Sequence, residues 1–286
     1  MSFRLRSFLT ILTLTISALA VTAHEFWLEP VRFVVAVGAR VHLGFWVGES
    51  FAGERWEAAP KRFATLHQRT PTGTRTDLTA AVRAGSPDSL ATTLTFAEAG
   101  THLLAMRSQE SLITLDGPKF TAYLREEGLD NALKTRAQRK QTAQPGREAY
   151  RRCAKTLVLV GNGPAAATDT ACLRPIGFPL ELVALQNPYA LAAGAAVPVR
   201  VLVAGKPAPA GVVVQVWQRS PNNRKAGAPT RLTTDARGQV QVPRQPGGGP
   251  VLVATVRMEA YPKGKAKTPA PADWRSTWAS LTFGGR

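Results

Sequence analysis

Apolar and polar residues alternate along short runs of this chain, with the period of two that is typical of half-buried β-strands. In the clearest run, Val41, Leu43, Phe45 and Val47 alternate with His42, Gly44 and Trp46. Similar runs, separated by turn-forming residues, predict strands at 62–67, 90–96, 101–107, 156–160, 180–185, 197–203, 212–217, 240–242, 251–256 and 277–283. Strands at this spacing predict a mostly β fold built from β-sandwiches.

A helical period appears only after Pro118, where apolar residues recur at three- and four-residue spacing. We predict a short helical and basic connector over about 118–155, which includes a basic helical turn at 147–155. The length suits two domains: an N-terminal β-sandwich domain over 24–174, connector included, and a C-terminal domain over 175–286. In the second, Thr233-Thr234-Asp235-Ala236-Arg237-Gly238 lies between two valine strands, which resembles immunoglobulin-like and transthyretin-like bacterial modules.

The first 23 residues have the three parts of a secretory signal peptide. Arg4 and Arg6 supply the positive start, an apolar stretch follows, and Val21-Thr22-Ala23 is a small-residue exit. The stretch is shorter than the roughly 20 residues that a membrane helix requires. We therefore expect export to the periplasm and cleavage after Ala23, although Ala18-Leu19-Ala20 is a second exit that would leave Val21 first.

The chain is strongly basic, with a formal net charge of +17. Because the cations are spread along the chain and the signal directs it out of the cytoplasm, we expect no nucleic-acid partner; anionic envelope surfaces are the available polyanions. There are two cysteines, Cys153 and Cys172. In an oxidising compartment they are predicted to form a structural disulfide.

The candidate chemistry lies at the predicted mature amino terminus. The free α-amine of His24 and its own Nδ1 can close a six-membered chelate on one metal ion, and such nitrogen donors suit nickel, cobalt, copper and zinc. His42 and His102 lie in predicted strands, and either is a candidate third donor. We rank His102 above His42 and His67, because it lies near a strand end on the face predicted for His24.

Glu25 and Glu29, close to His24, are candidate carboxylate ligands. No motif predicts catalysis, and we expect no enzyme. Gly161-Asn162-Gly163 lacks the third glycine and the acidic residue of a dinucleotide loop. The serine at position 50 lacks the glycine spacing of a hydrolase nucleophile.

The mature start His24-Glu25-Phe26-Trp27-Leu28-Glu29-Pro30 resembles the family designated domain of unknown function 4198. Further segments that carry the resemblance are 47–51, 119–129, 152–155, 179–182, 188–189 and 278–283. Some members are described as periplasmic components of nickel or cobalt uptake, so the resemblance implies one of these ions as cargo and a metal-uptake transporter of the inner or outer membrane as partner. Members often carry a histidine where this chain has Arg257.

Three hypotheses of function follow. The first is a periplasmic binding protein for nickel or cobalt, held by His24 with help from His102 or His42. The second keeps His24 but makes the ion copper and the protein redox-active, because an N-terminal histidine with a second histidine on a β-sandwich also resembles the copper-brace oxygenases. The third needs no metal: two sandwich modules serve as an envelope scaffold or adhesion protein.

Overall fold

The computed structural model describes residues 25–56, 60–84, 92–163, 165–166, 168–223, 225–262 and 271–284. The predicted signal peptide and His24 lie outside these residues. Among the residues described, no helix is both long and apolar enough to cross a membrane.

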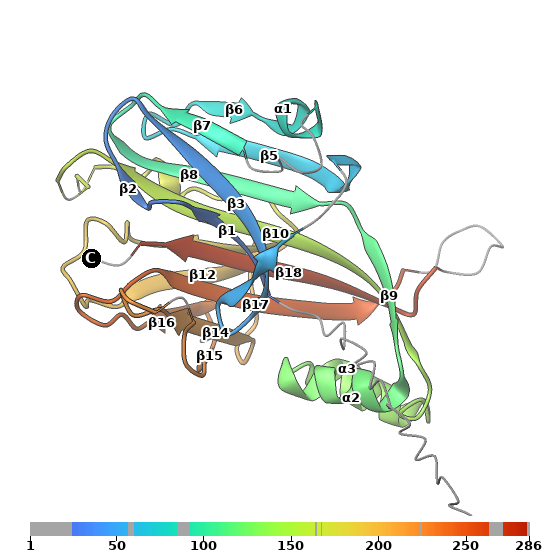
Figure 1. Ribbon diagram of the computed structural model, residues 1–286. Helices are drawn as coiled ribbons and strands as arrows, with labels where there is room; N and C mark the ends of the chain where they lie inside the picture. Colours follow the sequence, from blue (N-terminus) through green and yellow to red (C-terminus); the bar gives the residue numbers. More distant parts are fainter. Residues whose placement is uncertain are drawn as a thin grey trace, which may run out of the picture.

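The described residues form three β-sheets and three α-helices, so the prediction of a mostly β fold is confirmed (Figure 1). The N-terminal sheet consists of β1 (Glu25–Pro30), β3 (Ala39–Glu49), β4 (Ala52–Arg55) and β7 (Thr92–Phe96). The central sheet has the order β15 (Thr230–Thr233), β14 (Val213–Gln218), β17 (Val251–Ala260), β18 (Trp274–Phe283), β10 (Gly146–Val160), β8 (Gly100–Ser108), β5 (Phe63–Arg69), β6 (Arg75–Asp77), with β2 (Val34–Val35) and β9 (Ser111–Leu115) also paired to β10. The C-terminal sheet consists of β11 (Leu180–Ala184), β12 (Val197–Val203), β13 (Lys206–Pro207) and β16 (Gln239–Val242).

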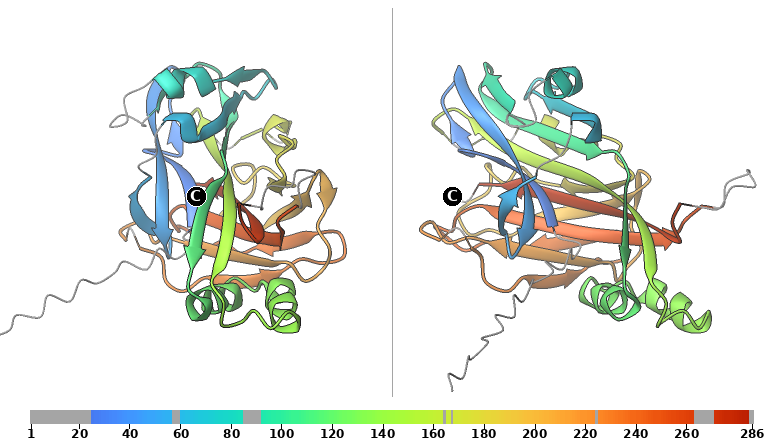
Figure 2. Two further views of the ribbon diagram at one scale, coloured as in Figure 1. Left: turned by 90° about the vertical axis from the view of Figure 1, so that its right-hand side faces the viewer. Right: turned by 45° about the vertical axis from the view of Figure 1, so that its right-hand side comes forward.

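The helices are α1 (Thr79–Ala84), α2 (Gly117–Glu126) and α3 (Asp130–Gln138), with short 3-10 turns at Pro60–Arg62 and Ala171–Leu173. Figure 2 shows α2 and α3 together at one end of the molecule, below the strands. Pro118 opens α2, in keeping with the preference of proline for the first turn of a helix.

Both faces of the central sheet are covered. On one face the N-terminal sheet forms a core with β5, β8 and β10, in which Leu28 and Leu104 take part. Helices α2 and α3 cover the same face further along, where Phe120 packs with Trp278. The C-terminal sheet covers the opposite face at β14, β17 and β18. Alternate side chains of the central strands therefore enter different cores, as the period of two requires.

One prediction is wrong: residues 147–155 form no helical turn but belong to β10, a strand of 15 residues. Strand β10 is parallel to β18 and antiparallel to β8 and β9, so its backbone is satisfied by partners on both sides. The division at residue 175 and the immunoglobulin-like or transthyretin-like topology stay predictions. The central sheet draws strands from both sides of that boundary.

Candidate functional site

Strand β1 sends alternate side chains to two faces of the N-terminal sheet. Phe26 and Leu28 enter the core shared with β8 and β10. Trp27 faces the other way and packs on Phe51, with ring centroids 5.4 Å apart, in the core that also contains residues of β14 and β17. Glu25 shares the side of Trp27 and is only 7% exposed. The side chains of this strand therefore alternate between two cores, and the carboxyl group of Glu25 points toward the central sheet.

Helix α2 places a second buried glutamate. Its apolar residues, including Phe120 and Leu124, dock on the central sheet. Gly128, with φ of +67°, follows the helix in a conformation that glycine adopts readily. Glu127 is thereby held at the docked end of the helix, 9% exposed, and its Oε2 accepts a hydrogen bond of 3.0 Å from Nε2 of Gln215 on β14.

The surroundings of these two glutamates disfavour their charged forms. Burial raises the pKa of Glu25 to about 7, and the carboxylates of Glu49 and Glu126 raise it as well. Burial also raises the pKa of Glu127 to about 8; Glu25 and Glu126 add repulsion, and Arg231 offsets it only in part. The carboxyl groups of Glu25 in β1 and of Glu127, directly after α2, thus repel each other, and a bound cation would stabilise their ionised forms.

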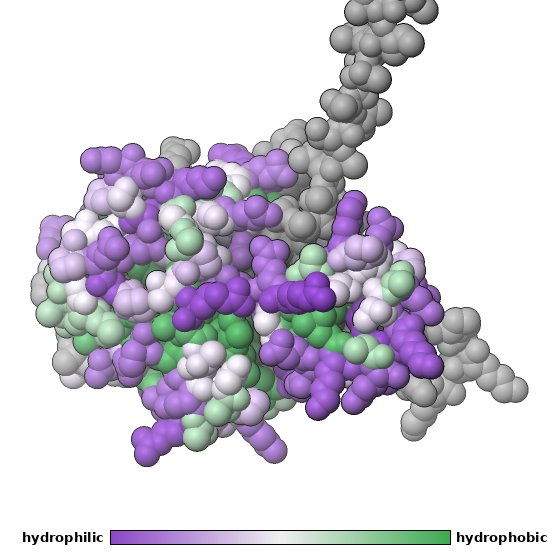
Figure 3. All heavy atoms as spheres, turned by 90° about the horizontal axis from the view of Figure 1, so that it is seen from below, coloured by the Kyte–Doolittle hydropathy of each residue, from purple (hydrophilic) through white to green (hydrophobic). Residues whose placement is uncertain are grey.

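A cleft of about 580 Å³ opens beside Glu127, between the loop that follows α2 and the segment that leads into β14. Arg257 of β17 lines the same cleft, and its guanidinium lies 3.5 Å from a carboxylate oxygen of Glu259. Glu127 and Arg257 therefore line the same cleft. From below, the surface is mainly hydrophilic, with apolar groups showing in patches between polar side chains (Figure 3).

His102 lies at the opposite end of the N-terminal sheet from Glu25. Its ring packs edge-on against Phe96 at 5.1 Å, and Phe96 pairs with Ala39 of β3, whereas Glu25 pairs with Gly48 of the same strand. Nine residues of β3 separate those two positions, which is roughly 30 Å at the rise of a strand. The structure does not bring His102 near the start of β1.

Both ring nitrogens of His102 also have protein partners. Nε2 lies 2.8 Å from the carbonyl oxygen of Glu98, and Nδ1 lies 3.2 Å from Nε2 of Gln68. With the ring proton on Nε2, that nitrogen donates to Glu98 and Nδ1 accepts from Gln68. Burial lowers the pKa of His102, consistent with a neutral core histidine. It is 1% exposed.

The other two described histidines are also apart from Glu25. His42 lies six residues along β3 from Gly48, the partner of Glu25, which is roughly 20 Å. His67 is buried in β5, with Nδ1 3.8 Å from Oδ1 of Asp77. Within the part of the chain that the structure describes, no three side chains of histidine, cysteine, aspartate or glutamate are grouped as metal ligands. His24 is outside that part.

The predicted disulfide between Cys153 and Cys172 is absent from the structure, where both are free and buried. They belong to different clusters: Cys153 packs with Ala105 and Phe178, and Cys172 with the core between the central and C-terminal sheets. Burial raises the pKa of each thiol to about 12. Oxidising surroundings alone predicted this bond, and they do not determine whether two cysteines meet in space.

Sequence reasoning named Glu25 as a possible ligand but missed Glu127. Glu127 follows helix α2 directly, about a hundred residues further along the chain, so no local spacing relates the two. The available signal was the segment 119–129, which contains Glu127 and carries part of the family resemblance.

Comparison with known proteins gives one extended match. The model of the family described as "Domain of unknown function (DUF4198)" matches residues 21–259. No curated protein matches the chain. Among solved structures, similarity extends to a mutant alpha-2-macroglobulin of Salmonella, at 14% identity and a TM-score of 0.22, over 91% of this chain and 15% of that one. The trypsin-activated alpha-2-macroglobulin of Escherichia coli gives 11% identity and a TM-score of 0.20, over 92% of this chain and 16% of that one. The chain spans only a small part of either protein, and likeness at these TM-scores does not bear on its function.

Proposed function

Because this chain belongs to the DUF4198 family, some of whose members are described as periplasmic components of nickel or cobalt uptake, we propose that it is a periplasmic binding protein for one of these ions. In this proposal the signal peptide is cleaved after Ala23, and the ion is held by the α-amine and imidazole of His24. The function is binding and delivery to an uptake transporter, without catalysis.

The observation that supports the proposal most is the burial of Glu25 and Glu127 together. Glu25 is bonded directly to His24, and its carboxyl group raises the pKa of Glu127. Placing two carboxyl groups in such surroundings lowers stability near neutral pH, unless a cation offsets their charge. A divalent ion held by His24 would supply that charge, and the carboxylates would add oxygen donors to its nitrogen donors.

The composition of this donor set differs from the one expected from sequence. His102 and His42 are replaced as candidate partners by Glu127, with Glu25 retained. Arg257 brings a positive charge to the cleft beside Glu127, at the position where family members often have histidine. Metal binding here therefore depends on the amino terminus and the carboxylates.

The test is calorimetric titration of nickel and cobalt into natively exported protein whose first residue has been confirmed by intact mass. We expect one tight site. A variant with one additional residue before His24 is expected to bind at least about tenfold more weakly, a loss of ~1.4 kcal/mol, because the amine and imidazole no longer belong to one chelate ring. Equal affinity in the two proteins would exclude the chelate.

A pair of substitutions tests the carboxylates separately. Glu127→Gln is expected to weaken nickel binding, whereas Glu54→Gln, at an exposed position of β4, is expected to have a small effect. If the exported protein with His24 first binds neither ion, the metal-binding function is wrong and the metal-free envelope scaffold replaces it.

A further inference from the structure

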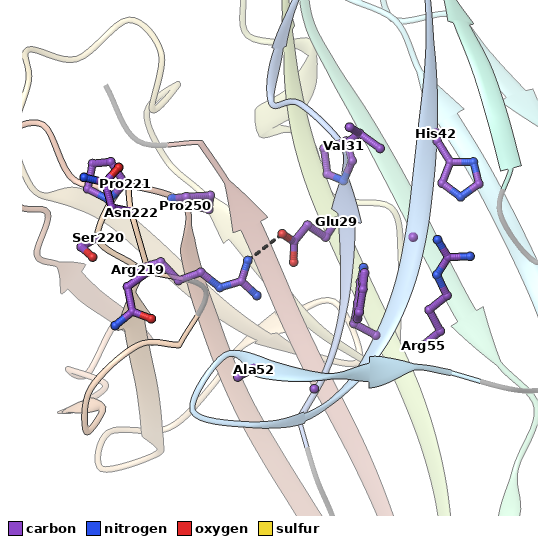
Figure 4. A pocket seen from close by; sticks show the side chains of 15 residues that line it. Glu29, Val31, His42, Ala52, Arg55, Arg219, Ser220, Pro221, Asn222 and Pro250 are labelled. Carbon is purple, nitrogen blue, oxygen red and sulfur yellow. Dashed lines mark hydrogen bonds and ion pairs between the residues drawn. The ribbon is translucent and has the colours of Figure 1, made fainter.

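A second pocket lies on the N-terminal sheet, away from Glu127 (Figure 4). It is a groove of about 640 Å³, and we call it the β3 groove because His42, Gly44 and Trp46 of β3 form its floor. Glu29 and Arg219 form one side, and Arg55 of β4 lies on the other. The loop 220–223 closes the end nearest β14.

Strand register explains why these side chains converge. Directly opposed residues of antiparallel strands point to the same face of a sheet. Glu29 is opposite Gly44, and Arg55 is opposite Trp46, so the groove residues of β1, β3 and β4 share one face. The indole of Trp46 lies over Gly44: a Cβ at residue 44 would come within 2.4 Å of its Nε1. Because Gly44 has no side chain, there is room for the ring of Trp46 in the groove.

The side of the groove formed by Arg219 is fixed by its own contacts. Its Nη1 donates a hydrogen bond of 2.6 Å to Oε1 of Glu29, and its Nε donates one of 2.8 Å to the carbonyl oxygen of Phe51. The other carboxylate oxygen of Glu29 accepts a hydrogen bond of 2.8 Å from the indole of Trp27. The charges of Arg219 and Glu29 thus neutralise each other, and this side is rigid and uncharged overall.

Arg55, in contrast, has no carboxylate partner among the residues that the structure describes. Its side chain is exposed and lies beside the ring of His42 at the groove (Figure 4). Desolvation lowers the pKa of His42, and the charge of Arg55 lowers it as well. Considering the described residues alone, the groove therefore offers one guanidinium without a carboxylate partner and one neutral imidazole, beside an indole surface.

We propose that the β3 groove binds a small organic monocarboxylate, with its carboxylate held by Arg55 and His42 and the body of the molecule against the ring of Trp46. A planar guanidinium donates two parallel hydrogen bonds to a carboxylate, and a neutral imidazole adds one more. The amphipathic indole provides apolar contact for a ring. A phosphate dianion fits less well, because Arg55 is the one cation among the described lining residues that has no carboxylate partner, and Glu29 borders the groove.

The proposal is tested by calorimetric titration of two acids, glucuronate and benzoate, with glucose and benzamide as their uncharged counterparts. A chelator in the buffer keeps metal ions out, so the result does not depend on the function proposed for His24. We expect at least one acid to bind at millimolar concentration or below, and its uncharged counterpart to bind at least about tenfold more weakly, as expected for loss of a charged hydrogen bond. The two acids distinguish a sugar ring from an aromatic ring on Trp46.

Variants assign the binding to this groove. Arg55→Gln and Trp46→Ala are each expected to weaken binding of the acid by about tenfold or more. Arg40→Gln is the matched control, because Arg40 is exposed on the same face of β3, two residues before His42, and does not line the groove. Failure of both acids to bind, equal binding of the uncharged counterparts, tighter binding of inorganic phosphate, or unchanged affinity in Arg55→Gln would each overturn the proposal.

Discussion

Replacing Glu127 by glutamine is expected to stabilise the metal-free protein at alkaline pH. Glutamine has nearly the shape of the protonated glutamate, and its oxygen still accepts the hydrogen bond from Gln215. The substitution removes a carboxyl group whose charged form is disfavoured by burial and by the charges of Glu25 and Glu126. The substitution should therefore relieve a cost that the wild-type protein carries only when Glu127 is ionised.

The magnitude follows from the pKa shift of Glu127, from 4.5 to about 8. A group whose pKa is raised by folding contributes stability that is fully present below pH 4.5 and is lost as the pH rises through about 8. At ~1.4 kcal/mol per pKa unit, the loss at pH 8 is about 4 kcal/mol. The charges of Glu25 and Glu126 contribute to this pKa shift together with burial. We therefore expect the Glu127→Gln substitution to add about 2–4 kcal/mol to the free energy of unfolding at pH 8, and nearly nothing at pH 4.5.

Urea unfolding of the metal-free protein at pH 5 and at pH 8 measures this difference. Glu54→Gln is the control, because the side chain at 54 is exposed and does not act on the pKa of Glu127. The same series with saturating nickel should reverse the order at pH 8, since the bound ion stabilises the wild type more than the variant. If Glu127→Gln gains no stability between pH 5 and pH 8 relative to wild type, the electrostatic reasoning about this site is wrong.

Other substitutions test other parts of the structure. Lys155→Met removes the ammonium group that lies 2.9 Å from the buried carboxylate of Glu181. Urea unfolding should show a loss of about 3–5 kcal/mol in the free energy of unfolding, and a loss below ~1 kcal/mol would contradict burial of the pair. His102→Ala should cost about 2–3 kcal/mol in the same assay but leave nickel affinity unchanged, whereas a tenfold loss of affinity would return His102 to the metal site. Cys153 and Cys172 should both resist a thiol reagent in the native protein and both react in denaturant, because burial raises their pKa to about 12; no reaction in denaturant would reveal a disulfide. Arg257→His should tighten nickel binding severalfold in calorimetry, because it replaces a cation that lines the cleft by a nitrogen donor. Unchanged affinity would show that residue 257 does not contribute to the metal site.

The alternation of apolar residues was sufficient to predict most strands, including those observed at Ala39–Glu49, Gly100–Ser108 and Val197–Val203. It failed at 147–155 because that segment carries cations that locally suggest an exposed helical turn. Their partners are distant in sequence: Arg147 pairs with Asp273 at 2.6 Å, and Arg151 donates to Thr277 at 3.0 Å. Residues about 126 positions away stabilise this strand, so a local pattern could not reveal it.

The candidate site was predicted only in part for the same reason. The chemistry of His24 and the proximity of Glu25 to it follow from covalent sequence alone. The partnership of Glu25 with Glu127 depends on how α2 docks against the central sheet, which periodicity does not specify. The choice of His102 came from its place near a strand end, but the register of β1 on β3 puts that end far from Glu25.

The position of β18 has a consequence for the order in which the chain can fold. This strand follows every other described strand in sequence, yet it lies between β17 and β10 in the interior of the central sheet. Until it arrives, β10 and β17 each present an unpaired edge, and unpaired edges invite pairing with other chains. Non-local pairing of this kind slows folding, because the intervening loop must close first. The ribosome must therefore have synthesised β18 before the sheet can close, and a chain that ends before Trp274 should remain sensitive to proteases and prone to aggregate.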